Sequence, residues 1–386
     1  MRHFDHLTAA DETRLFSRPA ESFTADDDSA VLALGLGATL YSPATRPALA
    51  KDIARQRLAG VLSVVVCLED AISDAEVEDA QRNAIEQLRD LAATQPDGPL
   101  VFVRVRHPGQ IPAVVDGLGE DLGILTGFVL PKFTGRSGLA FLDEVVAASD
   151  RSGRLLRAMP VLESPELVHA ENRPTALLAI RDLLAGYRQH VLALRIGATD
   201  LSAAFGLRRT RELSIYDIRV VADAIADIVN VFGRADGTGY VVTGPVWEYF
   251  SSPERLFKPQ LRQSPFAEHE EEPLRAELLA RDFDGLIREV VLDRANGLNG
   301  KTVIHPSHVA AVHALSVVTH EEYSDAIDVL GTAASGGAVA SAFRNKMNES
   351  KPHTAWAQGI VQRARVFGVA HPTTSFVDLL GAGLST

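Results

Sequence analysis

Eight short apolar segments recur along the first four-fifths of the chain, and each is nearly continuous in hydrophobic residues. Runs of this kind are typical of strands that are buried on both faces of a parallel sheet, whereas half-buried strands alternate apolar and polar residues. The pattern therefore predicts eight strands: Ala38–Ser42, Leu62–Leu68, Leu100–Val105, Gly127–Leu130, Leu156–Leu162, Val191–Ile196, Tyr240–Thr243 and Thr302–Ile304.

The segments between these strands repeat apolar residues at every third or fourth position, which indicates helices. The predicted helices are Ala48–Ala59, Asp74–Ala93, Gly138–Ser149, Pro174–Tyr187, Ile215–Phe232 and Pro273–Arg294. A strand–helix alternation repeated eight times predicts an α/β fold, the (β/α)8 or TIM barrel. An open, doubly wound sheet is the alternative, and only the count of eight strands separates the two.

Polarity divides the chain into three parts. Residues 1–30 are polar and acidic and are expected to form an N-terminal arm, residues 31–316 the barrel, and residues 317–386 a C-terminal helical extension. The pattern after Pro306 predicts helices only. Within the barrel, the polar connection 250–272 is too long for a plain loop, so we expect a lid or an insertion there.

Charge and composition narrow the range of partners. The formal net charge of −12 argues against nucleic acid or an anionic membrane as a partner, although local arginines can still bind a small anionic substrate. No apolar run is long enough to span a membrane, and no signal peptide is evident. The single cysteine, Cys67, fits a reducing compartment, so we expect a cytoplasmic protein.

Several predicted strands end directly in acidic residues. Glu163 follows one strand and Asp200 follows the next, and the carboxyl ends of barrel strands form the rim where ligands bind. Two carboxylates suffice for Mg²⁺, which retains several waters, so we expect these two residues to be metal ligands. The alternative is that each carboxylate caps the helix that follows it.

Two further groups of charged residues follow strands. Glu69 and Asp70 are expected to orient a metal-bound water or an arginine, or else to cap the following helix. Arg104 and Arg106 should share one face of their strand, where a buried guanidinium needs an anion. That anion is either a substrate carboxylate, an enolate, or an internal partner such as Glu69 or Asp70.

Two other residues are candidates for substrate binding. Lys132 follows the strand that ends at Leu130, and a charged lysine there would steady a substrate carboxylate or phosphate. His305 ends the last predicted strand, although a lone histidine is more often structural. Neither residue identifies the general base, because a metal-bound hydroxide is as plausible in that role as His305.

An ordered set of motifs runs from about Leu40 to Phe367. The set comprises Leu40-Tyr41-Ser42-Pro43-Ala44, Val66-Cys67-Leu68-Glu69-Asp70-Ala71-Ile72, Val103-Arg104-Val105-Arg106, Leu162-Glu163-Ser164, Gly197-Ala198-Thr199-Asp200-Leu201 and Gly300-Lys301-Thr302-Val303-Ile304-His305-Pro306. By these motifs the chain resembles the citrate lyase beta-subunit family, which includes the hydroxy-oxo-heptanedioate aldolases, and within it a divergent branch similar to members linked with tellurium-resistance gene clusters.

The resemblance implies a Mg²⁺-dependent C–C bond lyase on a (β/α)8 barrel, assembled as a homo-oligomer and often as a trimer. It also implies that Glu163 and Asp200 bind the metal and that Arg104 binds the substrate. Arg106 stands where the family usually has Asn, and the tail segment 344–348 lacks the Asp of acyl-CoA members, which puts thioester chemistry in doubt. Two other functions stay open, a pyruvate- or phosphoenolpyruvate-using transferase and a non-catalytic barrel.

Overall fold

The eight predicted strands form one parallel sheet that closes into a barrel. The computed structural model describes residues 1–95, 98–250, 272–334 and 336–384. The sheet order is β8-β7-β6-β5-β4-β3-β2-β9, and Gly244, just after β8, forms a parallel bridge to Lys301 of β9. The strands are β2 Ala38–Pro43, β3 Ser63–Cys67, β4 Leu100–Arg104, β5 Leu125–Leu130, β6 Arg157–Leu162, β7 Leu194–Ile196, β8 Val242–Thr243 and β9 Lys301–Val303. The barrel prediction is confirmed, and the open doubly wound sheet is wrong.

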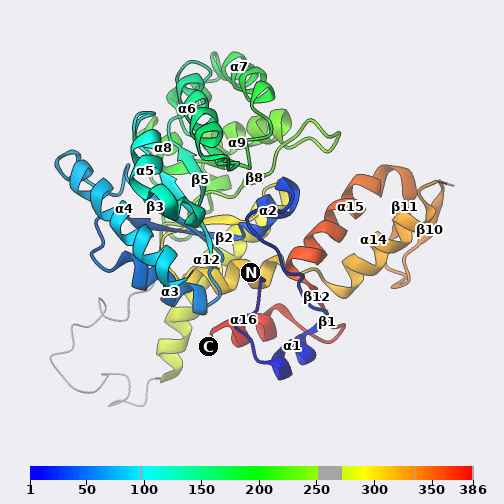
Figure 1. Ribbon diagram of the computed structural model, residues 1–386. Helices are drawn as coiled ribbons and strands as arrows, with labels where there is room; N and C mark the ends of the chain where they lie inside the picture. Colours follow the sequence, from blue (N-terminus) through cyan, green and yellow to red (C-terminus); the bar gives the residue numbers. More distant parts are fainter. Residues whose placement is uncertain (96–97, 251–271, 335, 385–386) are drawn as a thin grey trace.

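Helices surround the sheet on its outer side (Figure 1). They are α3 Leu49–Leu58, α4 Val77–Thr94, α5 Gln110–Leu118, α6 Ser137–Ser152, α7 Arg173–Gly186, α8 Ala198–Ala203, α9 Arg219–Phe232, α12 Glu272–Ala295 and α13 Ser307–Ser316. The hydrophobic period predicts all of these except α5 and α8. Among the described residues, no helix is both long and apolar enough to cross a membrane.

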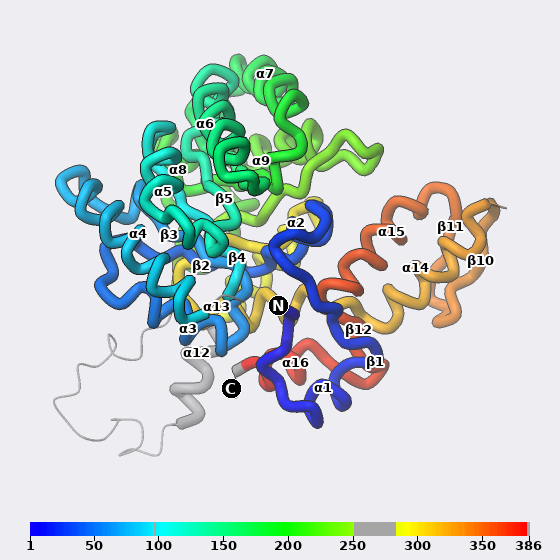
Figure 2. The backbone as a smooth tube through the Cα atoms, in the orientation of Figure 1, coloured from blue at the N-terminus to red at the C-terminus, as the bar shows by residue number. Residues whose placement is uncertain are grey.

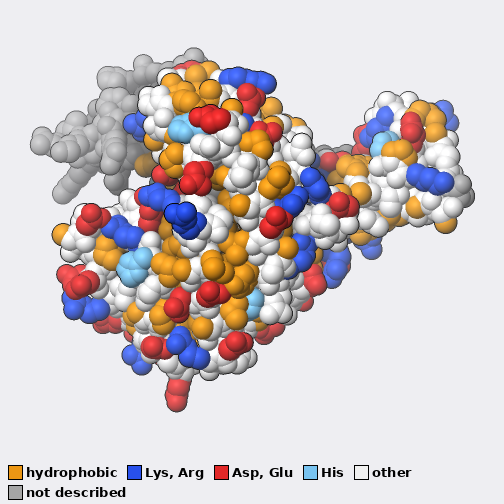
Figure 3. Space-filling model, turned by 90° about the horizontal axis from the view of Figure 1, so that it is seen from above, with side chains coloured by type: hydrophobic (Ala, Val, Ile, Leu, Met, Phe, Trp, Pro, Cys, Tyr) orange, Lys and Arg blue, Asp and Glu red, His pale blue; other side chains and the backbone are white. Residues whose placement is uncertain are grey.

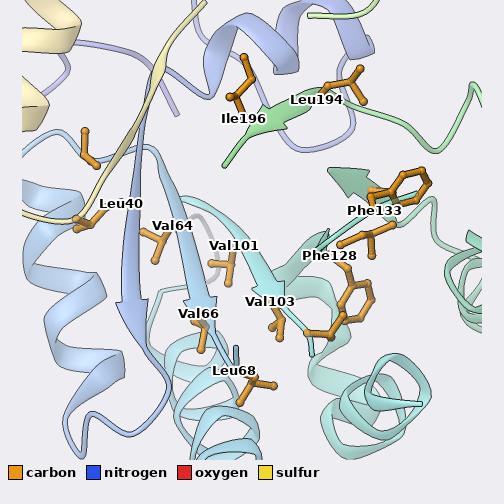
Figure 4. Packing of buried hydrophobic residues seen from close by; sticks show 14 of the residues in the cluster. Leu40, Val64, Val66, Leu68, Val101, Val103, Phe128, Phe133, Leu194 and Ile196 are labelled. Carbon is orange, nitrogen blue, oxygen red and sulfur yellow. The ribbon is translucent and has the colours of Figure 1, made fainter. Parts of the chain in front are cut away.

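Alternate residues of each strand point to opposite sides of the barrel wall. Val64, Val66, Val101 and Val103 belong to the cluster that the strands share with the surrounding helices, as Figure 4 shows. The residues between them, such as Val65 and Phe102, point inward and fill the barrel in a second cluster. Both faces are therefore buried, which explains why the strands read as continuous apolar runs.

The two ends of the chain lie side by side (Figure 2). After α1 Ala9–Leu15, strand β1 Phe16–Arg18 pairs antiparallel with β12 Val369–Ala370, and α16 Phe376–Leu384 follows. From the N-terminal region, Phe23 and α2 Ser29–Gly35 pack against the interior cluster of the barrel. The first 30 residues thus contribute buried side chains.

Residues 320–367 form a projecting arm, seen beside the barrel in Figures 1 and 3. Helices α14 His320–Thr332 and α15 Ser350–Phe367 pack together, and the hairpin of β10 Ala338–Ala340 and β11 Met347–Glu349 lies at the far end. The expectation of helices only after Pro306 is therefore wrong. Gly336 and Gly337 have positive φ, which lets the chain turn into a strand there. The predicted lid or insertion at 250–272 lies almost wholly outside the described residues.

Candidate active site

Glu163 and Asp200, the two predicted metal ligands, lie together at the carboxyl-terminal rim of the barrel, meaning the residues that directly follow the strands. Glu163 comes immediately after β6 and is only 3% exposed. Asp200 lies in the first turn of α8, which begins two residues after β7 ends. The two carboxyl groups are near enough for the charge of Asp200 to raise the pKa of Glu163. These acids, 37 positions apart in the sequence, therefore meet in the fold.

A glycine makes room for the Glu163 carboxylate. A Cβ atom at Gly197 would lie 2.1 Å from Glu163 Oε2 and 2.4 Å from Glu163 Cβ. Real Cβ atoms do not approach other atoms this closely. Any larger residue at position 197 would therefore displace Glu163 or the backbone between β7 and α8.

Arg104, the last residue of β4, joins three acids inside the rim. Its Nη2 atom lies 2.7 Å from Glu69 Oε2, 3.0 Å from Asp70 Oδ2 and 3.0 Å from Glu163 Oε1. The side chain is 9% exposed, so these contacts are mostly screened from water. The internal ion pair expected as one alternative for Arg104 is present, and it also aims the guanidinium at Glu163.

Lys132 joins the same group through its backbone and its side chain. Its N–H donates to Glu163 Oε1 at 2.8 Å, and its Nζ donates to Glu69 Oε1 at 2.8 Å. The residue has φ of +46°, in the left-handed region that non-glycine residues rarely adopt. Such conformations cost about 1–3 kcal/mol and concentrate at functional sites. Here the strained backbone directs an N–H at Glu163.

We call Glu69, Asp70, Glu163 and Asp200 the carboxylate cluster. Burial raises the pKa of Glu163 to about 7, with Arg104 opposing the rise and Asp200 adding to it. Burial also raises the pKa of Asp200 and of Glu69. Burial of Asp70 acts in the same direction, but its hydrogen bond with Glu69 and the charge of Arg104 outweigh it, and the pKa falls. Burial therefore makes it costly in free energy to keep these carboxylates ionised.

The two cations beside the carboxylate cluster, Arg104 and Lys132, both remain charged. Burial alone would lower the pKa of Arg104, but its attraction to Glu163 and Glu69 raises it overall. The hydrogen bond to Glu69 raises the pKa of Lys132, against a smaller effect of burial. A charged lysine is expected at this position, and a neutral, nucleophilic amine is disfavoured.

The donor set suits a hard divalent cation. Four carboxylates against Arg104 and Lys132 leave a formal charge of −2, which one Mg²⁺ would neutralise. Within the described ranges, no group of three or more His, Cys, Asp or Glu side chains is arranged as a ready-made metal cage. Mg²⁺ does not need one, because it is usually bound through one or two carboxylates and keeps its waters. The residues therefore fit a magnesium ion at Glu163 and Asp200.

Arg106 and His305 lie outside the carboxylate cluster. Strand β4 ends at Arg104, so strand alternation no longer governs Arg106, which binds Asp74 and the carbonyl oxygens of Glu69 and Ile72. His305 stacks on Phe250 at 4.6 Å between ring centroids, and its Nδ1 lies 2.7 Å from Ser307 Oγ. Arg106 thus braces the loop that carries Glu69 and Asp70.

Helix capping does not explain Glu69, Asp70 or Glu163, whereas Asp200 does lie in the first turn of α8. Helix α4 is preceded by a capping box of Ser73 and Glu76, which leaves Glu69 and Asp70 free for Arg104. Glu163 Oε1 accepts hydrogen bonds from Arg104 and Lys132, which belong to other strands or loops. The sequence pattern therefore placed these acids together at the rim, and their functional roles stay predictions.

Three residues near the site were given no role in the sequence analysis: Gly197, Tyr41 and Arg195. The need for a glycine at position 197 is evident only from the close approach of the Glu163 side chain in the folded structure. Tyr41 reads as one more apolar residue of β2. Arg195 carried a usable signal, because a charged residue within the apolar run 192–196 is costly to bury unless it serves a purpose.

Comparison with known families agrees with this geometry. Residues 30–369 match the model of the family described as C–C bond lyases of the TIM-barrel fold. The chain belongs to this family. The resemblance to lyases of the citrate lyase beta-subunit type is thereby confirmed at the level of the family, and with it the expectation of a carbon–carbon lyase. No match was found among curated proteins.

Solved structures share the barrel at low sequence identity. A citrate lyase from Burkholderia xenovorans is 16% identical, covers 91% of this chain and 96% of its own, and has a TM-score of 0.61. A malate synthase from Haloferax volcanii, in complex with magnesium and glyoxylate, is 14% identical over 71% of this chain and 73% of its own, with a TM-score of 0.51. At such identity these neighbours show the fold alone.

Proposed function

We propose that this member of the lyase family is a Mg²⁺-dependent enzyme that cleaves a C–C bond in a small anionic substrate. The substrate class is a 3-hydroxy acid, a 4-hydroxy-2-oxo acid or a related acyl conjugate. The observation that carries the proposal is the carboxylate cluster with its two cations at the barrel rim, with a formal charge of −2. Glu163 and Asp200 would hold the ion. When bound, Mg²⁺ supplies Lewis acidity for an oxygen that gains negative charge during cleavage.

Arg104 has the central role among the protein's own groups. Its planar guanidinium is held by Glu69, Asp70 and Glu163, and it would stabilise the negative charge that develops on an enolate. A preorganised donor of this kind is typically worth about 3–4 kcal/mol of transition-state stabilisation. Because Arg104 is already fixed by three acids, it needs little reorganisation during the reaction.

The other charged residues support Arg104. Glu69 and Asp70 orient the guanidinium and would orient a water on the metal. Lys132 would steady a substrate carboxylate, and its N–H fixes Glu163. Arg106, which was expected to bind a substrate anion or an internal acid, binds Asp74 and keeps the Glu69–Asp70 loop in place. We keep His305 as a substrate contact at the edge of the rim, where it lines a cavity of about 280 Å³ with Tyr41.

Direct cleavage assays test the proposal. The purified protein is incubated with a panel of 3-hydroxy and 4-hydroxy-2-oxo acids and their acyl conjugates, with Mg²⁺ or with a chelator, and release of pyruvate, oxaloacetate or acetyl groups is measured. We expect release from at least one panel member, dependent on Mg²⁺ and reduced about 10²–10³-fold in Arg104→Lys. Arg89→Lys, in an exposed ion pair with Asp121, is the matched control. Cleavage that is unaffected by chelation would contradict the proposal.

We also propose that the protein acts in the cytoplasm as a homo-oligomer. A buried, free Cys67 is compatible with a reducing compartment. The arm exposes several large apolar side chains, among them Val339, Phe343, Met347 and Trp356, and a second copy could cover them. Sedimentation of the purified protein measures its mass, and a monomer at micromolar concentration would contradict this part.

A further inference from the structure

Arg195 lies inside the barrel without a counter-ion among the described residues. It points inward from β7 and is only 1% exposed. Its Nη2 donates to Thr302 Oγ1 at 2.6 Å, its Nη1 lies 3.3 Å from Thr39 Oγ1 and 3.8 Å from the sulfur of Met159, and its Nε has no hydrogen-bond partner in the described part of the chain. A buried guanidinium supported only by neutral groups is costly, so a purpose for it is expected.

Tyr41 lies against this guanidinium. The Cζ atom of Arg195 lies 5.3 Å from the centroid of the Tyr41 ring, within the range of a cation–π contact. A guanidinium can only donate hydrogen bonds, so Arg195 cannot accept the proton of the Tyr41 hydroxyl, which stays free to donate to another group. Arg195 therefore holds the Tyr41 ring in place without taking up its O–H.

The phenol lies between the barrel interior and the rim. Its ring packs on the interior cluster, but the residue is partly exposed, unlike Arg195. Together with His305, it also lines a cavity of about 280 Å³ between strand β2, the end of β9 and helix α3. On the side of the carboxylate cluster, Arg104 and Glu163 are near enough to act on it electrostatically. Burial raises the pKa of Tyr41, and the two arginines oppose that rise, so the phenol is protonated at neutral pH.

We propose that Tyr41 is the proton donor to the enolate carbon formed by C–C cleavage, and that Arg195 is the positioning residue that aims it. The inference rests on the proposed lyase function and extends it, because that function leaves the enolate without an assigned acid. General acids of this kind typically contribute about 10²–10⁴-fold to the rate.

The proton transfer balances without an added reactant. Cleavage of the C–C bond leaves its electron pair in the enolate. The Tyr41 O–H bond then breaks, a C–H bond forms at the enolate carbon, and the oxygen keeps its electron pair as a phenolate beside Arg195 and Arg104. The phenolate recovers a proton from water, and the proton that the substrate hydroxyl releases returns to water, so no net proton is consumed.

Exchange of pyruvate methyl protons in D₂O isolates this step. The exchange passes through an enolate and does not require C–C cleavage, and proton NMR follows it in the presence of Mg²⁺. We expect Tyr41→Phe to lower the exchange rate at least about 10²-fold. Tyr187→Phe, which removes an exposed hydroxyl bound to Asp143, is the matched control and should exchange at the wild-type rate.

Binding of oxalate, a planar mimic of the pyruvate enolate, separates a catalytic from a structural role. Calorimetry with Mg²⁺ present should give Tyr41→Phe an oxalate affinity within about threefold of wild type, because the metal ligands and Arg104 are untouched. Arg195→Lys should lower exchange in the wild-type background but add nothing to Tyr41→Phe, since both act through one hydroxyl. Further loss in the double variant would overturn the positioning role.

Three outcomes would overturn the assignment of Tyr41. They are exchange by Tyr41→Phe within threefold of wild type, loss of oxalate binding or of the fold together with exchange, and absence of exchange in the wild type. If the wild type still cleaves members of the substrate panel in any of these cases, the lyase proposal stands without Tyr41. If the wild type cleaves none of them, the proposed function itself fails.

Discussion

Replacement of Arg104 by methionine tests whether the carboxylate cluster depends on its buried cation. The change removes the group that lies 2.7 to 3.0 Å from Glu69, Asp70 and Glu163 while keeping much of its apolar volume. Glu69 and Glu163 are 5% and 3% exposed, so neither can recover its lost partner fully from water. Removal of one partner from a buried ionic group typically costs about 3–5 kcal/mol.

The pH dependence of this loss gives a second signature. Without Arg104, the pKa values of the buried carboxyls in the folded protein rise further above those in the unfolded chain. The folded state then binds more protons than the unfolded one, so the penalty is largest at high pH and shrinks as pH falls. Mg²⁺ should restore part of the stability at pH 8, because it supplies positive charge to the same carboxylates.

Urea unfolding followed by circular dichroism measures both effects at pH 8 and pH 5, with and without Mg²⁺. Arg89→Met is the matched control, since Arg89 forms an exposed ion pair with Asp121 at 3.2 Å, and such pairs are worth about 0–1 kcal/mol. If Arg104→Met loses no more stability than this control at pH 8, or loses more at pH 5 than at pH 8, the description of the cluster is incorrect.

Two further predictions concern packing and acid stability. Gly197→Ala should destabilise the fold by about 1–3 kcal/mol and weaken Mg²⁺ binding, because its Cβ would overlap Glu163, whereas Gly186→Ala, which has open space, should do neither in urea unfolding and metal titration. His3 is buried, and burial lowers its pKa to about 3. Below pH 6.5 the imidazole therefore binds a proton in the unfolded chain but not in the folded chain. Stability is therefore full above pH 6.5 and is lost as pH falls toward 3, and His3→Gln should remove about 2 kcal/mol of the wild-type loss between pH 6.5 and 5. An unchanged pH profile in His3→Gln, with exposed His107→Gln as the control, would contradict this reasoning.

The barrel was predictable because its strands are buried on both faces. Both faces of such a strand are apolar, so the strand appears in the sequence as an unbroken apolar run. The eight runs correspond to the eight strands of the closed sheet. The helix α5 was missed because its nine residues include a proline and a glycine, which disguise the period. The hairpin at the end of the arm was missed because three-residue strands are too short to show alternation.

The site was predictable to the extent that position along a strand determines position on the rim. Acids that directly follow parallel strands must meet at one end of a barrel, so Glu163, Asp200 and Arg104 could be placed together. Arg106 could not, because the strand stops before it and the loop decides its direction. Arg195 contacts residues of other strands inside the barrel, and Glu163 lies close to Gly197. These contacts join residues that are far apart in the sequence, so no local sequence pattern predicts them.

Titration of Mg²⁺ into the purified protein tests the central claim most directly. Calorimetry on wild type, Glu163→Gln and Asp200→Asn compares chains that differ by one oxygen-to-nitrogen replacement at each proposed ligand, with exposed Asp79→Asn as the control. The account predicts one Mg²⁺ bound per wild-type chain, the same affinity in the control, and a loss of at least about tenfold in each ligand variant. Equal affinity in all four proteins would contradict it.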